Sequence, residues 1–202
     1  MAKQTKDIEL ELRAEITPSR FDLFTEKFRV FGKQVSVSRR LSVMFFGTIG
    51  RKAFDIRVRT DDKGFSEIVC KKGDYHSHNR AEYSERISKK QMLGFAKIFF
   101  LLGLNAKVTE RENFVFDFPN EVVVTITRAK KICYIEFEKM AHEASAEATR
   151  RELVALMAKF NLSPLNKNQF TDICRRLDKK ADWQFGGFPA DFKKLSGLFD
   201  KY

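Results

Sequence analysis

The sequence predicts an α+β fold in which eight antiparallel strands are covered by helices. Runs that alternate apolar and charged residues recur along the chain, and this period of two is typical of strands with one buried face. Other segments carry apolar residues at helical spacing, which indicates amphipathic helices. The order of these elements shows hairpins and no repeating strand–helix–strand unit, so an antiparallel sheet is expected.

The first expected strand covers residues 8–16, where apolar residues alternate with charged ones without a break. Thr17-Pro18-Ser19 supplies turn and cap chemistry for a helix over residues 20–31, whose phenylalanines recur at helical spacing. The turn Asp62-Lys63-Gly64 indicates a hairpin between two later strands. Four further strands are expected at about residues 34–46, 54–61, 65–72 and 80–87.

The second half of the chain begins with an expected helix over residues 88–104. Three strands at about 107–118, 121–127 and 132–139 and two helices at about 143–160 and 167–177 follow. Residues 1–180 are predicted to form one domain. Residues 181–202 are predicted to form a C-terminal tail whose short helix packs on that domain.

Charge and cysteine content limit the classes of function. The net charge of +11, from 38 Lys and Arg against 27 Asp and Glu, favours polyanions such as nucleotides, polyphosphate or nucleic acid. Solvated Lys-rich helices would give the same charge without such a partner. Cys70, Cys133 and Cys174 are far apart and are expected to be reduced thiols of a cytoplasmic protein. Neither a signal-peptide pattern nor an apolar run of membrane-spanning length is present, so no membrane partner is expected.

Charged side chains share one face on several of the expected strands. They are Glu9, Glu11 and Arg13 on the first strand, Arg57 and Arg59 on the third, Arg80, Glu82 and Arg86 on the fifth, and Glu136 and Glu138 on the eighth. Two arrangements satisfy this pattern. The sheet is either open with a wet charged face, or closed into a barrel with charge inside and helices outside.

Paired carboxylates on two different strands favour the closed arrangement. Four acids that converge in a partly dehydrated interior repel one another unless a cation lies among them. Mg²⁺ and Mn²⁺ prefer oxygen ligands and keep positions for water or phosphate oxygens. Arg and Lys on neighbouring strands would neutralise the other phosphoryl oxygens, so the pattern suits a linear triphosphate.

In these residues the chain resembles the triphosphate tunnel metalloenzymes and, within them, the CYTH domains. The family opens with a Glu-x-Glu-x-Lys strand, and this chain reads Glu9-Leu10-Glu11-Leu12-Arg13. The other matching segments, in order, are Phe45-Phe46-Gly47-Thr48, Ile56-Arg57-Val58-Arg59, Lys72-Gly73, Arg80-Ala81-Glu82, Arg111-Glu112-Asn113-Phe114, Ile135-Glu136-Phe137-Glu138 and Asn168-Gln169-Phe170-Thr171-Asp172-Ile173. The resemblance implies a closed eight-stranded antiparallel β-barrel, a triphosphate tunnel with a polar, charged interior and helices outside.

Three positions depart from the family pattern. Arg13 stands where the family has Lys, and a guanidinium cannot titrate as an ammonium can. The family has a Tyr-Phe-Asp-Thr-like segment where this chain reads Phe45-Phe46-Gly47-Thr48, so Gly47 stands in place of its Asp. The family also has an Asp before its last strand, and only Thr125 or Thr127 lies near that place. The expected metal site is therefore reduced to four glutamates.

The resemblance implies metal-dependent hydrolysis of the terminal phosphate of tripolyphosphate, thiamine triphosphate or a nucleoside triphosphate. The expected ligands of Mg²⁺ or Mn²⁺ are Glu9, Glu11, Glu136 and Glu138. The expected phosphate-binding residues are Arg13, Arg57, Arg59, Lys72, Arg80 and Arg111, with Lys71 as an alternative to Lys72. Glu9, Glu11 and Arg13 are the expected catalytic residues, and Glu82 is expected to orient the attacking water or to pair with an arginine.

Three other functions fit the same residues. The first strand and the segment Ile16-Thr17-Pro18-Ser19-Arg20-Phe21 are also similar to metal-dependent RNA 5′-triphosphatases, which would make an RNA 5′ end the partner. The family also includes adenylyl cyclases, in which the substrate's own hydroxyl replaces water. A non-catalytic module that binds polyphosphate or RNA is the alternative outside enzymes.

Overall fold

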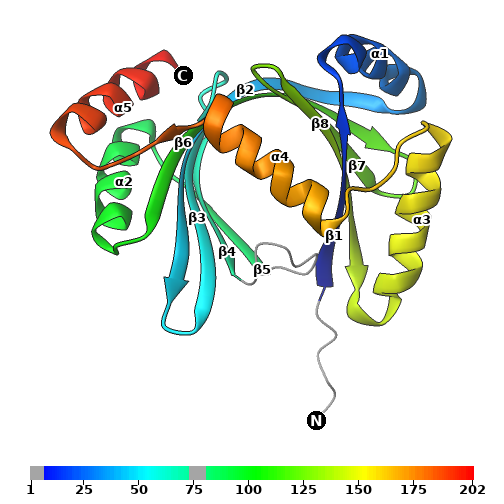
Figure 1. The fold of residues 1–202 in the computed structure, drawn as a ribbon, viewed down its shortest axis with the longest axis horizontal. Coiled ribbons are helices and arrows are strands. Elements are labelled where there is room, and N and C mark those ends of the chain that lie inside the picture. The colour runs from blue at the N-terminus through cyan, green and yellow to red at the C-terminus, as the bar shows by residue number, and fades with distance from the viewer. Residues whose placement is uncertain (1–6, 73–80) are drawn as a thin grey trace. The chain divides into compact units, whose positions relative to one another are not determined.

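The computed structural model describes residues 7–72 and 81–202 (Figure 1). The strands are β1 (Asp7–Ile16), β2 (Lys33–Ile49), β3 (Lys52–Asp61), β4 (Ser66–Lys72), β5 (Ala81–Arg86), β6 (Asn105–Phe118), β7 (Val122–Ala129), β8 (Ile132–His142) and β9 (Trp183–Gln184). The helices are α1 (Phe21–Phe31), α2 (Met92–Leu101), α3 (Ala146–Lys159), α4 (Lys167–Lys180) and α5 (Pro189–Lys201). The α+β prediction is confirmed, and the short strand β9 was not expected.

The strands follow the order β1-β8-β7-β6-β2-β3-β4-β5, and β9 pairs with β6. The pairings of β1 with β8, β8 with β7, β2 with β3, β3 with β4 and β4 with β5 are antiparallel. Within the described residues, β1 and β5 are the two ends of this order and do not pair with each other. The expectation of a closed barrel was therefore wrong, because alternation in a strand specifies which face is buried and not whether the outermost strands meet.

The described residues fall into two compact units. Unit 1 contains the described residues up to Val37 together with Asn113–Arg176, and unit 2 contains the described residues of Ser38–Glu112 together with Leu177–Tyr202. Strands β2 and β6 and helix α4 contribute residues to both units.

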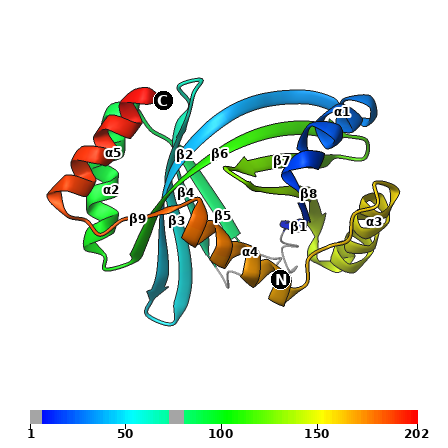
Figure 2. The same ribbon diagram turned by 45° about the horizontal axis from the view of Figure 1, so that its top comes forward.

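The core of unit 1 lies between α1, α3 and the apolar faces of β1, β7 and β8 (Figure 2). Phe28 of α1 is fully buried, and its ring meets Phe116, Phe137 and Phe160 edge to face, with centroids 5.8, 6.0 and 4.9 Å away. Edge-to-face pairs add to the free energy that burial of the rings contributes. This packing explains why phenylalanine recurs at helical spacing in α1.

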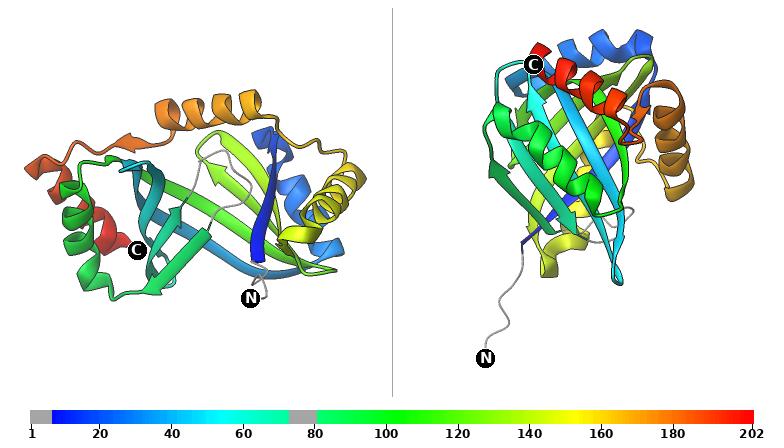
Figure 3. Two further views of the ribbon diagram at one scale, coloured as in Figure 1. Left: turned by 90° about the horizontal axis from the view of Figure 1, so that it is seen from below. Right: turned by 90° about the vertical axis from the view of Figure 1, so that its left-hand side faces the viewer.

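The core of unit 2 is formed by α2, α5 and the apolar faces of β2, β3 and β6, and α2 and α5 lie side by side (Figure 3). Phe185, Leu195 and Phe199 are buried in it. These residues belong to the predicted tail 181–202, so that segment is part of the core of unit 2.

No helix in the described part of the chain combines the length and the apolar character that a membrane span requires.

Candidate functional site

The charged face of β1 lies beside the charged face of β8 in unit 1. Glu11 is opposite Glu138, and Arg13 is opposite Glu136. Paired residues in an antiparallel sheet share a face, so the charged faces of the two strands form one surface. The apolar residues between them are buried in the core of unit 1.

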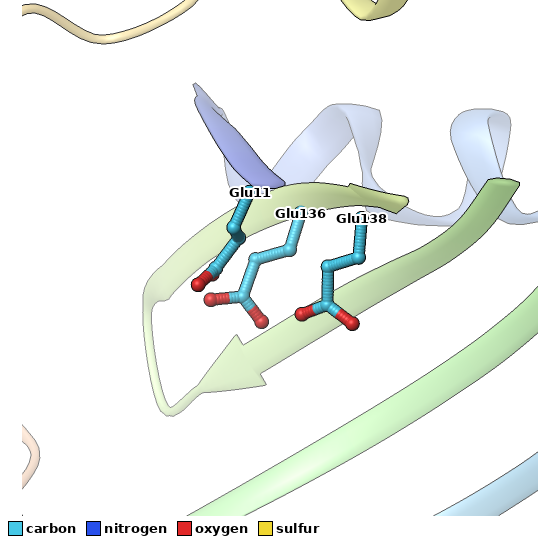
Figure 4. A group of neighbouring side chains, drawn as sticks. All are labelled: Glu11, Glu136 and Glu138. Atoms are coloured by element: carbon cyan, nitrogen blue, oxygen red, sulfur yellow. The ribbon is translucent and has the colours of Figure 1, made fainter. Parts of the chain in front are cut away.

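Three of the four predicted glutamates come together on this surface. Glu11, Glu136 and Glu138 each offer a carboxylate oxygen, and the three oxygens lie within 4.8 Å of one another. Figure 4 shows the three side chains extending from their strands to the same side. Each of the three residues is half-buried. The fourth, Glu9, lies opposite Met140 and is not part of this group.

Arg13 is placed among the carboxylates. Its Nε–H donates to Glu136 Oε1 at 2.7 Å, and its other end is ion-paired with Glu11. The guanidinium also lies over the ring of Phe170 in α4, 4.7 Å from the centroid. Arg13 therefore neutralises part of the acidic group.

Burial raises the pKa of the Glu11 carboxyl well above its ordinary value. The Arg13 cation opposes this rise in pKa, whereas Glu136 and Glu138 add to it. A carboxylate in this environment is stabilised by a further cation. The electrostatics of the group thus agree with the metal ligation predicted from the sequence.

The spacing of the three carboxylate oxygens also fits a hard divalent cation. Oxygen ligands lie about 2.1 Å from Mg²⁺ in an octahedron, so adjacent ligands are about 3 Å apart and opposite ones about 4.2 Å apart. Three oxygens within 4.8 Å of one another can meet those separations after small side-chain rotations. The donor set consists of carboxylate oxygens, which Mg²⁺ and Mn²⁺ prefer.

Thr125 lies beside this group. The sequence alone left open whether Thr125 or Thr127 would lie there. It lies on β7 directly opposite Glu136, so it shares the charged face. Thr127 lies one step further along, opposite Tyr134, and its hydroxyl donates to Asn113 Oδ1 at 3.0 Å. Of the two threonines, Thr125 is therefore the one directly opposite a residue of the acidic group.

Unit 2 carries the predicted phosphate-binding arginines Arg57 and Arg59 on one face of β3. Arg57 donates from Nε and Nη2 to the carboxylate of Asp55 at 3.0 and 2.7 Å, and Asp55 is almost fully buried. Arg59 donates to Glu67 at 2.7 Å across the β3–β4 pair. Asp55 and Glu67 were not predicted, although Asp55 follows the same alternation as the two arginines.

Strand register decides between Lys71 and Lys72. Lys71 lies opposite Asp55 and Glu82 and therefore shares the face of Arg57, whereas Lys72 lies opposite Phe54 on the other face. The ammonium of Lys71 is 2.5 Å from Glu82, so Glu82 pairs with a lysine on the neighbouring strand. Lys71, and not Lys72, is therefore the lysine that shares the face of Arg57. Arg80 lies outside the described residues.

Arg111 of β6 is 2.7 Å from the carboxylate of Asp182, and Lys107 is 3.2 Å from the other oxygen of that carboxylate. Lys107 also lies 2.6 Å from Asp178 at the end of α4. Neither aspartate nor Lys107 was predicted. No local sequence signal identifies this contact, since it joins β6 to residues about seventy positions further along the chain.

Gly47 of β2 lies opposite Phe54, on the apolar face. Its φ of +156° is a conformation that side chains rarely adopt, and a Cβ there would be 3.0 Å from Leu104 Cδ2. A side chain at position 47 would therefore point to the apolar face of the sheet and not to the charged face.

Comparison with known proteins gives matches of structure only. No protein-family model and no curated protein matches the sequence. Solved structures match, and three of them have 14–18% identity. A Pyrococcus horikoshii protein (14% identity) covers 84% of this chain and 99% of its own length, with a TM-score of 0.66.

Two further matches have names that mention an activity. A protein from Vibrio parahaemolyticus, proposed to be an adenylate cyclase, covers 83% of this chain and 98% of its own, with a TM-score of 0.62 and 18% identity. A proposed adenylyl cyclase from Hippeastrum, described as having a dominant triphosphatase activity, covers 85% and 96%, with a TM-score of 0.52 and 14% identity. The chain therefore has the fold of the CYTH and triphosphate tunnel proteins, as the sequence resemblance predicted.

Proposed function

We propose that this chain hydrolyses the terminal phosphoryl group of a triphosphate with a divalent cation held in unit 1. The observation that carries the proposal is the convergence of Glu11, Glu136 and Glu138 on one half-buried surface. Carboxylates gathered in this way repel one another, and a hard cation removes the repulsion.

The ligands in this proposal are Glu11, Glu136 and Glu138, and Glu9 is assigned to the edge of the site. A bound Mg²⁺ or Mn²⁺ would supply Lewis-acid stabilisation of the charge that develops on the phosphoryl oxygens. Arg13 has a fixed positive charge beside two of the ligands. It would limit the negative charge of the group and offer remaining N–H donors to a phosphoryl oxygen.

The proposal assigns phosphate binding to Arg57, Arg59, Lys71 and Arg111, together with Arg80 on sequence grounds alone. Carboxylate partners orient the first four. A guanidinium has five N–H donors, so it can bind a carboxylate and a phosphoryl oxygen together. Glu82 would act by holding Lys71.

A second candidate function is cyclisation of a nucleoside triphosphate, which the names of the Vibrio and Hippeastrum neighbours favour. The same metal and phosphate contacts would serve, with the substrate's own hydroxyl as the attacking group. Water attack would release phosphate, and attack by the 3′-hydroxyl of ATP would release pyrophosphate and cyclic AMP.

The test is an assay of the purified protein with Mg²⁺ or Mn²⁺ and four substrates: tripolyphosphate, thiamine triphosphate, ATP and RNA with a 5′-triphosphate. Glu136→Gln and Glu138→Gln keep the shape of the side chain and remove one ligand charge each. We expect each to lower kcat/KM by about a hundredfold or more. Glu147→Gln, an exposed change on α3, is the matched control and should leave the rate unchanged.

Metal binding is measured separately by the shift of the unfolding temperature with Mn²⁺. The shift should disappear in Glu136→Gln and persist in Glu147→Gln. A wild-type protein that binds polyanions but shows no metal-dependent turnover on any of the four substrates would instead be a binding module, and the hydrolase proposal would be wrong.

A further inference from the structure

Four charged residues of unit 2 form a compact cluster. Two of them lie on β6, and the other two lie at the C-terminal end of α4 and just after it. Lys107 and Arg111 are the cations, and Asp178 and Asp182 are the anions. The Lys107 side chain is 10% exposed and the Arg111 side chain 9%, so both cations are nearly buried. The ring of Phe46 lies 5.8 Å from the Lys107 ammonium, which places Lys107 on the face of β2 that carries Phe46.

Asp182 is fixed in place. Its side chain is fully buried and lies against both cations, at 3.2 Å from Lys107 and 2.7 Å from Arg111. Its backbone N–H donates to the carbonyl of Leu177, and the next two residues pair with β6 as strand β9. Movement of this carboxylate would take it away from two nearly buried cations, which is strongly unfavourable.

Asp178 is held far less firmly than Asp182. It lies on α4, its side chain is 41% exposed, and its carboxylate is ion-paired with Lys107 at 2.6 Å. A rotation about its side-chain bonds would move the carboxylate into water, where it is well solvated. An ion pair with one exposed partner is worth little, so the exchange costs little.

Within these four residues two cations face two anions, so an incoming polyanion must compete with a carboxylate for the Lys107 ammonium. A triphosphate carries several negative charges and competes well with a single carboxylate for one ammonium. The carboxylate that can leave is that of Asp178.

We propose that Lys107 is a further phosphate-binding residue and that Asp178 is its internal competitor. A phosphoryl oxygen replaces the Asp178 carboxylate at the Lys107 ammonium, while Asp182 stays and holds both Lys107 and Arg111 in position. The inference rests on the proposed function, because that function supplies the triphosphate. It adds a binding residue that the resemblance does not contain, and an acid on α4 that sets the affinity.

The test measures binding of tripolyphosphate by titration calorimetry in the presence of EDTA, so that hydrolysis and metal binding do not contribute. Asp178→Asn keeps the size of the side chain and removes the competing charge. We expect it to lower Kd about fivefold relative to wild type. Asp172→Asn is the matched control, because Asp172 lies on the same helix, is 46% exposed and pairs with arginines of unit 1.

Lys107→Gln should raise Kd about tenfold, and the gain from Asp178→Asn should vanish when both substitutions are combined. Circular dichroism checks that the lysine variant is folded. If it is not, the comparison of Asp178→Asn with Asp172→Asn decides alone. Equal affinity in those two variants, or no binding by either, overturns the inference.

The outcome is separable from that of the hydrolysis assay. Turnover by wild type with no effect of Asp178→Asn on binding contradicts this inference alone. Tighter binding by Asp178→Asn with no turnover on any substrate supports this inference and contradicts the hydrolase proposal.

Discussion

Arg13 and Glu136 lie opposite each other on β1 and β8, and the Arg13 Nε–H donates to Glu136 Oε1 at 2.7 Å. The same guanidinium pairs with Glu11 and lies over the ring of Phe170. One permanent cation is thus built into a group of three carboxylates. This cation offsets part of the repulsion among the three carboxylates.

Arg13→Gln removes that cation. Because the pair is half-buried, we expect the free energy of unfolding in EDTA to fall by about 1–2 kcal/mol, which corresponds to roughly 3–6 °C in Tm. The three carboxylates then repel one another more strongly, so Mg²⁺ should raise Tm by more in the variant than in wild type. Differential scanning fluorimetry with and without Mg²⁺ measures both effects. Arg29→Gln breaks an exposed pair with Glu26 and is the control; an identical Mg²⁺ shift in Arg13→Gln and wild type would contradict the prediction.

The pKa of Glu11 predicts how the stability of the metal-free protein depends on pH. Burial raises this pKa in the folded state above the ordinary value of 4.5, so the folded protein holds a proton that the unfolded chain has lost. The contribution to stability is therefore fully present below about pH 4.5 and is lost as pH rises through the raised pKa.

Glu11→Gln mimics the protonated form and removes this dependence. In EDTA, the free energy of unfolding of the variant minus that of wild type should grow as pH rises from about 4 to 8. Urea unfolding at several pH values measures the difference. Glu9→Gln, on the same strand but outside the acidic group, controls for the loss of one charge. A difference between Glu11→Gln and wild type that stays constant with pH would count against this reading of Glu11.

Patterns within single strands were predictable from sequence, and relations between distant strands were not. Glu11 and Glu138 could be placed on charged faces because each alternates with buried apolar neighbours, and burial of one face enforces that alternation. The α+β class followed from the same patterns. Whether β1 pairs with β5 depends on the curvature and tilt of the whole sheet, which no local period encodes.

The acidic residues that pair with the predicted cations were likewise predictable within one strand and not between distant segments. The choice between Lys71 and Lys72 requires the register of β3 and β4, and a change of one residue in the turn that joins them would reverse it. Asp55 was within reach of the sequence, because it stands two residues before Arg57 on the same strand. Asp182 was not, because its approach to Arg111 depends on how the chain returns to β6 after α4.

Gly47→Asp restores the residue that the family has at this position, yet we expect no gain of activity. The new side chain would start 3.0 Å from Leu104 Cδ2, with a φ that L-residues rarely adopt. A carboxylate directed at the apolar core should cost about 2–3 kcal/mol of stability. Urea unfolding measures the cost, and Gly94→Asp is the control because position 94 is exposed, its backbone φ is not positive and a Cβ there meets nothing within 4 Å. Equal stability of the two variants would show that the apolar face accepts the acid.

Asp182→Asn tests the fixed anion of unit 2. The substitution leaves Lys107 and Arg111, both nearly buried, without the carboxylate that they share. We expect a loss of about 3 kcal/mol in the free energy of unfolding. Asp178→Asn, whose side chain is 41% exposed, should cost less than about 1 kcal/mol. Similar losses in the two variants would mean that Asp182 is no more strongly held than Asp178.

Thr125→Asp would place a fourth carboxylate on the acidic surface of unit 1, directly opposite Glu136. In the metal-free protein the added charge lies beside three acids, so it should lower the unfolding temperature. With Mn²⁺ the same charge becomes an additional ligand or a partner for metal-bound water, and we expect Kd for Mn²⁺ to fall about tenfold. Thr125→Asn has nearly the same shape without the charge and should change neither quantity in this way. The two expected effects have opposite signs and a single cause, since repulsion among the acids is what the cation relieves. A variant that loses stability without a gain in Mn²⁺ affinity would show that the three glutamates do not face a common cation.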